Sequence, residues 1–316
     1  MRTLIRIIYK TVLYTSPAWM FYFYLEYRLG MLENSYSFKI KHFNSIKDSC
    51  KVLILGNSEM LKGINPDFLP QPAFNMAQVS QNYVVDELIL QKYLSQLPQL
   101  KLVVLGLTYL SFGDDLASGE EAWRISFYKK HYGVDLNNNF DLKDYSNTLR
   151  YTPYEAFKMA LTNFKTDLVN GIQANGWMRA DGHDSSNLTD EFAQQRARMH
   201  TQSLRLENVS KNTTALRNII ALLKERKIQI LLVAPPVMQN YNRSLDQKWL
   251  ERNDSIMSKL TLEYQLEVDD FTKSNDSRYR IFEGRFNDVN HLNKEGANSL
   301  GTLLSGHLLE TKKYNP

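Results

Sequence analysis

The chain of 316 residues is poor in the residue types that build small cross-linked or unstructured proteins. It contains one cysteine, Cys50, so neither an internal disulfide nor a cysteine-built metal site is available to it. Glycine and proline number only 14 and 9, a low share that excludes collagen-like and low-complexity chains. With 43% hydrophobic and 23% charged residues, a chain of this length can bury a sizeable core.

Other absences concern ligands. Lysine and arginine (38) barely exceed the acids (34), and beyond the amino terminus they are nowhere concentrated without acids among them, so nucleic acid is not an expected partner. The phosphate-binding patterns G-x-x-x-x-G-K-[ST] and G-x-G-x-x-G are absent around Gly56 and Gly63. The histidines His131, His183 and His200 share no ligand spacing. We therefore expect neither a cofactor nor a metal.

Residues 1–31 differ from the rest of the chain. Arg2, Arg6 and Lys10 precede an uncharged run over 11–25 that contains six aromatic residues. A membrane span needs about 20 apolar residues, so this run must borrow preceding residues while the cations reach toward the headgroups. The segment predicts an N-terminal membrane anchor.

We expect this anchor to be uncleaved, because no small-x-small cleavage site follows it. The positive-inside tendency would leave the basic end in the cytoplasm and place residues 32–316 outside, as a single-pass membrane protein with a periplasmic or extracellular body. Pro17 and the interior cations leave a second interpretation open, an amphipathic helix that lies on the membrane or packs on the body.

In the body, short apolar runs alternate with amphipathic stretches. Strand, helix and strand in that order predict a parallel sheet, and the whole pattern predicts a three-layer α/β domain of about five strands. The segment 113–206 lacks the alternation, and we interpret it as an insertion that folds into helices over the strand ends. The expected strands are 51–56, 73–77, 100–107, 228–233 and 266–271, and the expected helices are 82–97, 213–226, 245–264 and 294–309.

The first motif, Gly56-Asn57-Ser58-Glu59, follows the first predicted strand. Glycine allows a sharp turn there, and the Ser58 hydroxyl can then stand exposed at the carboxyl edge of the sheet, where a nucleophile would fit. The alternative is that Ser58 only caps the following helix.

The second motif, Asn287 to Asn293, precedes the last helix. An aspartate three residues before a histidine, here Asp288 and His291, can accept the Nδ1 proton and leave Nε2 facing a nucleophile as a general base. Alternatively, the two residues form a structural turn while Asn293 caps the helix. In a parallel α/β sheet both motifs lie at the carboxyl edge, so Ser58 and His291 can meet.

Together these residues resemble the SGNH/GDSL-type hydrolases, and within them the membrane-anchored cell-surface members with a G-[DSN]-S-x start. The first family block corresponds to Gly56-Asn57-Ser58, with Asn in place of the usual Asp, and the last block, D-x-x-H-[LP], is met by Asp288, His291 and Leu292. The resemblance implies a flavodoxin-like three-layer α/β/α sandwich and acyl transfer through Ser, His and Asp.

The two middle blocks depart from the family pattern. The second, N-x-G-x-x-G, corresponds to Asn75–Ser80, so Ser80 stands where the oxyanion-binding glycine is expected. The third, G-x-N-D, corresponds to Gly106–Tyr109, with Thr108 in place of the asparagine. The Thr108 hydroxyl can replace one donor, and Ser80 can offer its N–H if its backbone takes a glycine-like conformation. Since one lost donor costs about 2.7–4 kcal/mol, we expect a slow or narrowly specific site.

The resemblance implies an outward-facing esterase or O-acyltransferase acting on ester-linked acyl groups, such as acetyl groups of a cell-surface polysaccharide. Ser58 would attack the acyl carbon, His291 would transfer the proton and Asp288 would orient His291, with Ser80, Thr108 and Asn57 at the oxyanion or substrate. The alternative is a catalytically inactive binding or assembly protein of a surface-polymer pathway with the same fold. The resemblance covers 51–112 and 228–309, and the insertion and the amino terminus lie outside it.

Overall fold

The computed structural model describes residues 2–118, 120–136, 141–162, 169, 171–182, 185–273 and 275–310. Five parallel strands lie at its centre, in the order β2-β1-β3-β4-β5. The expected α/β fold with a parallel sheet of about five strands is therefore confirmed. The strands are β1 (Val52–Leu55), β2 (Ala73–Asn75), β3 (Leu102–Gly106), β4 (Gln229–Ala234) and β5 (Glu267–Asp270).

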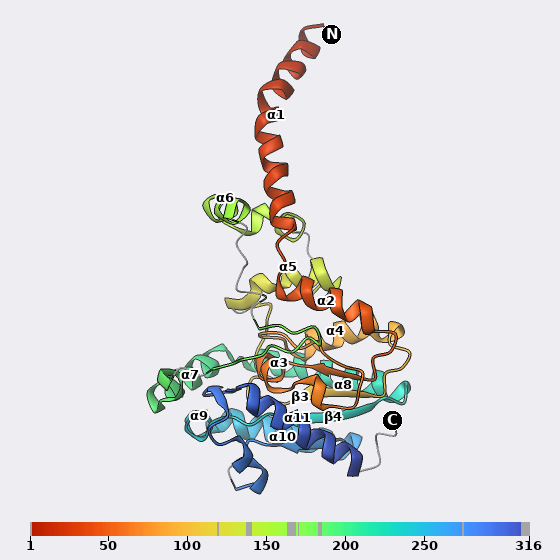
Figure 1. Cartoon of the computed structure of the whole chain (residues 1–316), viewed down its shortest axis with the longest axis vertical. Helices are drawn as coiled ribbons and strands as arrows, with labels where there is room; N and C mark the ends of the chain where they lie inside the picture. Colours follow the sequence, from red (N-terminus) through yellow and green to blue (C-terminus); the bar gives the residue numbers. More distant parts are fainter. Residues whose placement is uncertain are drawn as a thin grey trace.

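Helices cover both faces of this sheet (Figure 1). Successive strand side chains point to opposite faces, so Leu53 and Leu55 join one hydrophobic core while Val52 and Ile54 join the other. The first core is closed by α2 (Ser35–Ile46), α4 (Tyr83–Tyr93), α8 (Leu206–Glu225) and α10 (Gln247–Tyr264), and the second by α3 (Ser58–Gly63) and α11 (Lys294–Glu310).

A small antiparallel pair, β6 (Phe286–Asp288) and β7 (His291–Leu292), precedes α11 in the chain, and β7 packs against α3 and α11. The second motif therefore lies in a separate hairpin rather than directly after the last strand of the main sheet.

The segment between β3 and α8 contributes α5 (Ile125–Phe127), α6 (Pro153–Thr162) and α7 (Asp190–Ser203). Part of it runs beside the sheet: the Asn75 N–H donates to the Asn175 carbonyl (2.9 Å), and the Trp177 indole donates to the Lys62 carbonyl in α3 (2.8 Å). Helix α7 packs on α9 (Gln239–Ser244). The insertion thus contacts the helix that begins at Ser58.

The N-terminal helix α1 (Arg2–Gly30) extends away from the body and meets α6 near its carboxyl end (Figure 1). None of the described helices combines the length and apolarity that a membrane crossing requires, so the predicted single-pass anchor, and the localisation built on it, are wrong. The physical reason is composition. The uncharged run of α1 is rich in tyrosine, threonine and serine, and charged residues stand at both of its ends. Near the body, Glu26 accepts hydrogen bonds from the N–H groups of Asn147 (2.8 Å) and Thr148 (2.9 Å).

Candidate active site

The loop after β1 presents Ser58 at the carboxyl edge of the sheet. Gly56 has a φ of +128°, and a Cβ at this position would lie 2.8 Å from the Met60 Cγ, so the turn and the close packing both require glycine. The Asn57 side chain accepts the Glu59 N–H (3.0 Å) and caps α3. The alternative in which Ser58 caps this helix is therefore wrong. Ser58 occupies the first helical position and stays half-buried.

The hairpin β6–β7 brings a histidine to that serine. The Nε2 atom of His291 lies 2.9 Å from the Ser58 Oγ, and its Nδ1 lies 2.9 Å from both carboxylate oxygens of Asp288. The Asp288 Oδ1 also accepts the N–H groups of Asn290 (3.1 Å) and His291 (3.0 Å). The structure thus places Ser58, His291 and Asp288 in one hydrogen-bonded chain. Asn293 caps α11 through the Gly296 N–H (3.0 Å), as expected.

Burial and charge set the protonation of this chain. Burial would raise the pKa of Asp288, but the adjacent His291, its hydrogen bonds and the nearby Lys62 together hold that pKa well below its usual value. Burial lowers the pKa of His291 and the Lys62 charge lowers it further, while Asp288 opposes both effects. A neutral imidazole beside an ionised carboxylate is the state in which Nε2 can accept a proton.

The two altered blocks also lie at this edge of the sheet. Ser80 has a φ of +57°, the left-handed conformation that its glycine-like role requires. No described residue accepts the backbone N–H of Ser58 or of Ser80. The Thr108 Oγ1 accepts a hydrogen bond from the Asn57 Nδ2 (2.8 Å) and lies 3.4 Å from the Ser111 Oγ, so its single proton can turn to Ser111 or to another acceptor.

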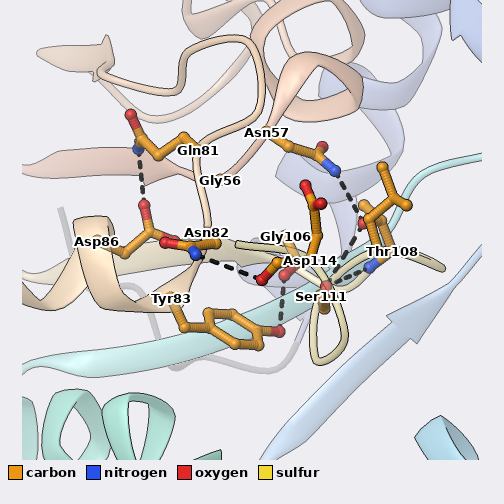
Figure 2. A pocket seen from close by; sticks show the side chains of 11 residues that line it. Gly56, Asn57, Gln81, Asn82, Tyr83, Asp86, Gly106, Thr108, Ser111 and Asp114 are labelled. Atoms are coloured by element: carbon orange, nitrogen blue, oxygen red, sulfur yellow. Dashed lines mark hydrogen bonds between the residues drawn. The ribbon is translucent and has the colours of Figure 1, made fainter. Parts of the chain in front are cut away.

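A cavity of about 20 Å³, large enough for roughly one water molecule, is lined by Asn57 and Thr108 together with other polar residues (Figure 2). The Asp86 carboxyl lines it, accepts a hydrogen bond from the Gln81 Nε2 (2.6 Å) and keeps its Oδ2 without a partner. Burial raises the pKa of Asp86 to about 7. The cavity is lined by Gly56, Asn57, Gln81, Asn82, Tyr83, Asp86, Gly106, Thr108, Leu110, Ser111 and Asp114.

Sequence reasoning missed several polar residues around the triad. Glu59, directly after Ser58, is buried and accepts a hydrogen bond from the Asn290 Nδ2 (3.3 Å). Burial raises the pKa of Glu59 to about 8, so this side chain is largely neutral at pH 7. The Nζ of Lys62 lies 3.5 Å from the His291 Nδ1. Arg196 acts electrostatically on His291 from the insertion. Only the position of Glu59 beside Ser58 could have drawn attention to it in the sequence.

The insertion histidines occupy different surroundings. His131 contacts the Asn34 side chain (3.2 Å), and the Nδ1 of His200 lies 2.6 Å from the Tyr241 hydroxyl. His183 lies outside the described residues.

No family model matches this sequence, and no curated protein matches it. Two solved structures are similar to the chain. A provisionally named acylhydrolase from Bacteroides fragilis is 11% identical, with a TM-score of 0.39, over 84% of this chain and 89% of its own. A GDSL-like lipase from Bacteroides thetaiotaomicron is also 11% identical, with a TM-score of 0.40, over 87% of this chain and 98% of its own.

Proposed function

We propose that the protein is a serine esterase or O-acyltransferase whose catalytic residues are Ser58, His291 and Asp288. The hydrogen-bonded chain that joins these three side chains carries the proposal, because each distance in it is 2.9 Å. A serine whose hydroxyl meets the Nε2 of a neutral, carboxylate-oriented histidine is arranged for nucleophilic attack.

In the proposed reaction the Ser58 Oγ attacks the acyl carbon of an ester while His291 accepts the serine proton at Nε2. The histidine then gives this proton to the departing alkoxide, and an acyl-serine remains. Water or a second hydroxyl, deprotonated by the same Nε2, then attacks the acyl carbon of the acyl-serine. The bond to the Ser58 Oγ breaks, His291 returns the proton to this oxygen, and hydrolysis or transfer is complete. Asp288 holds the imidazole orientation and stabilises its charged form.

The oxyanion that forms in both steps needs donors. We assign this role to the backbone N–H groups of Ser58 and Ser80 and to the Thr108 hydroxyl, with Asn57 fixing Thr108. A hydroxyl with one rotatable proton replaces the amide of the family pattern. This substitution favours a slow or narrowly specific enzyme, as the sequence suggests. Acetylated glycans are the first substrates to test.

Labelling with a fluorophosphonate tests the proposal without knowledge of the substrate. Intact mass should show one adduct on the wild-type chain and none on Ser58→Ala or His291→Ala. Hydrolysis of an activated acetate ester should fall at least about 10³-fold in Ser58→Ala. Ser210→Ala, which removes an exposed hydroxyl on α8, is the matched control and should behave as wild type. A folded wild-type protein with no adduct would instead support the inactive binding protein.

A further inference from the structure

Two cationic side chains, Lys62 and Arg196, lie near Ser58, His291 and Asp288. Lys62 lies one helical turn after Ser58 on α3, so the two side chains share one face of this helix. Its Nζ reaches to 3.5 Å from the His291 Nδ1. Because the Nδ1 proton is already donated to Asp288, this contact is an electrostatic one. Lys62 is half-buried and retains access to solvent.

The second cation comes from the insertion. On α7, Ala193, Arg196, Ala197 and His200 follow the i, i+3, i+4, i+7 spacing of one helix face. This face is held against the site, because both alanines are buried in a cluster with Tyr241 and Val289, and His200 contacts the Tyr241 hydroxyl at 2.6 Å.

Arg196 therefore lies on the helix face that is clustered with Val289, between Asp288 and His291 in the chain, and its guanidinium stands over the Phe192 ring at 5.1 Å. It is half-buried, and its charge acts on Lys62, His200, Tyr241 and His291.

The local charge is unbalanced. Among the described residues, no acidic oxygen lies within 4.0 Å of Lys62 or of Arg196. Asp288 is the ionised acid nearby, and it is already engaged with His291. Glu59 is buried and largely neutral. Two like charges held beside one nucleophile cost free energy that an anionic ligand would recover.

We propose that Lys62 and Arg196 form an anion subsite, so that the preferred substrate is an acyl ester that carries a carboxylate or phosphate group near the scissile bond. Guanidinium binds such groups through two parallel hydrogen bonds, while the ammonium acts as a point charge. This inference rests on the proposed esterase function and narrows its substrate class to anionic esters.

A pair of esters that differ in charge tests the subsite. We would measure kcat/KM at pH 8 for 4-acetoxybenzoate, which is anionic, and for its neutral methyl ester. The comparison is made on wild type, Arg196→Gln, Lys62→Gln and the control Arg198→Gln, an exposed arginine on the same helix. Since both esters are assayed on each variant, differences in their intrinsic reactivity cancel.

The anionic-to-neutral ratio of kcat/KM should fall at least about 10-fold in Arg196→Gln and in Lys62→Gln, and should stay unchanged in Arg198→Gln. Loss of activity toward both esters by the same factor, or no change in the ratio, would overturn the anion subsite.

A binding measurement separates this inference from the esterase proposal. Calorimetry should show that Ser58→Ala binds 4-acetoxybenzoate and that the double variant Ser58→Ala/Arg196→Gln binds it more weakly. The neutral methyl ester should bind Ser58→Ala more weakly than the anionic ester does. Equal affinities in the two proteins would reject the subsite even if fluorophosphonate labels Ser58. Weakened binding together with absent labelling would reject the esterase and keep the anion site.

Discussion

At the scale of single residues, His291 links charge to activity. Only its neutral form can accept the serine proton, so kcat/KM should be present above its pKa and lost as pH falls through it. Burial and Lys62 lower this pKa from its ordinary 6.5, so the acid limb of the profile should lie below pH 6.5. In Lys62→Met the opposing charge is gone, and the midpoint should move to higher pH. A pH profile of kcat/KM for a neutral ester, recorded on the wild type and on Lys62→Met, measures the two midpoints.

Arg198→Gln is the control for that experiment, because it removes a cation from α7 that does not contribute to the shifted pKa of His291. An acid limb that stays fixed in Lys62→Met would show that the Lys62 charge does not contribute to the pKa of His291.

Ser80 supplies a second test at this scale. Its φ of +57° is costly for a residue with a Cβ, so Ser80→Gly should relieve strain and raise the free energy of unfolding by up to about 1 kcal/mol. Ser80→Val adds β-branching and should lower stability by about 1–2 kcal/mol, together with kcat. Thermal unfolding and ester hydrolysis on the same samples measure the two effects.

Ser210→Gly makes the same chemical change inside helix α8, where glycine is unfavourable by roughly 0.5–1 kcal/mol. The two serine-to-glycine variants should therefore shift the melting temperature in opposite directions. Shifts of the same sign would show that Ser80 carries no relievable strain.

At the scale of elements, the sequence was sufficient where a local pattern decides the structure. Short apolar β-branched runs identify β1, β3 and β4, because a strand buried on both faces has few other compositions. Helix α2 was not anticipated, because lysine, serine and histidine interrupt its apolar positions. The anchor prediction failed because the uncharged run over 11–25 contains tyrosine, threonine and serine, which make it less apolar than a membrane span.

The same distinction applies to the site. Ser58, Asp288 and His291 stand in short motifs with a chemical signature, so their neighbourhood could be predicted. Lys62 and Arg196 carry no local signal, because their relation to the triad arises only when α3 and α7 pack around it. Charged residues that an insertion brings together in space therefore cannot be predicted from residue spacing in the sequence.

Glu26 provides a prediction for the elements themselves. Its carboxylate accepts the N–H groups of Asn147 and Thr148, and these bonds join α1 to the insertion. In Glu26→Ala, amide hydrogen exchange in the last turns of α1 should speed up, while ester hydrolysis should not change. Glu225→Ala, an exposed change at the end of α8, serves as the control.

Several opposing contributions set the pKa of Glu26 to about 2, below its ordinary 4.5. Burial raises it, and the hydrogen bonds from Ser146, Thr148 and Asn147 outweigh burial. A lowered carboxyl pKa contributes stability above pH 4.5 that is lost as pH falls toward 2. Protection of α1 should therefore weaken in acid in the wild type and be independent of pH in this range in Glu26→Ala. Unchanged exchange in the variant would show that other contacts hold the helix.

At the scale of the whole molecule, two buried carboxyls tie stability to pH. Burial raises the pKa of Glu59 to about 8 and that of Asp86 to about 7, from ordinary values of 4.5 and 3.8. Both lie near the carboxyl edge of the sheet, since Glu59 follows Ser58 and Asp86 lines the cavity that Thr108 also lines. The burial that keeps His291 neutral therefore also favours the protonated forms of Glu59 and Asp86, whereas Asp288 stays ionised through its hydrogen bonds and the charges nearby.

The sign of the resulting pH dependence follows from proton binding. Above about pH 6.5 the folded protein retains protons on Glu59 and Asp86 that the unfolded chain releases, so the free energy of unfolding should decrease as pH rises toward 8. Below pH 6.5 the lowered pKa values of His131, His200 and His291 act in the opposite sense. Glu59→Gln and Asp86→Asn should each flatten the decrease, because a neutral amide has nothing to ionise. Asp288→Asn should act in the opposite sense, since the lowered pKa of this carboxyl stabilises the fold above pH 4. Urea unfolding at half-unit pH intervals measures all four proteins. A free energy of unfolding that rises toward pH 8 would show that Glu59 and Asp86 ionise in the folded protein at little cost. The pH range in which His291 is neutral would then not be a range in which the fold loses stability.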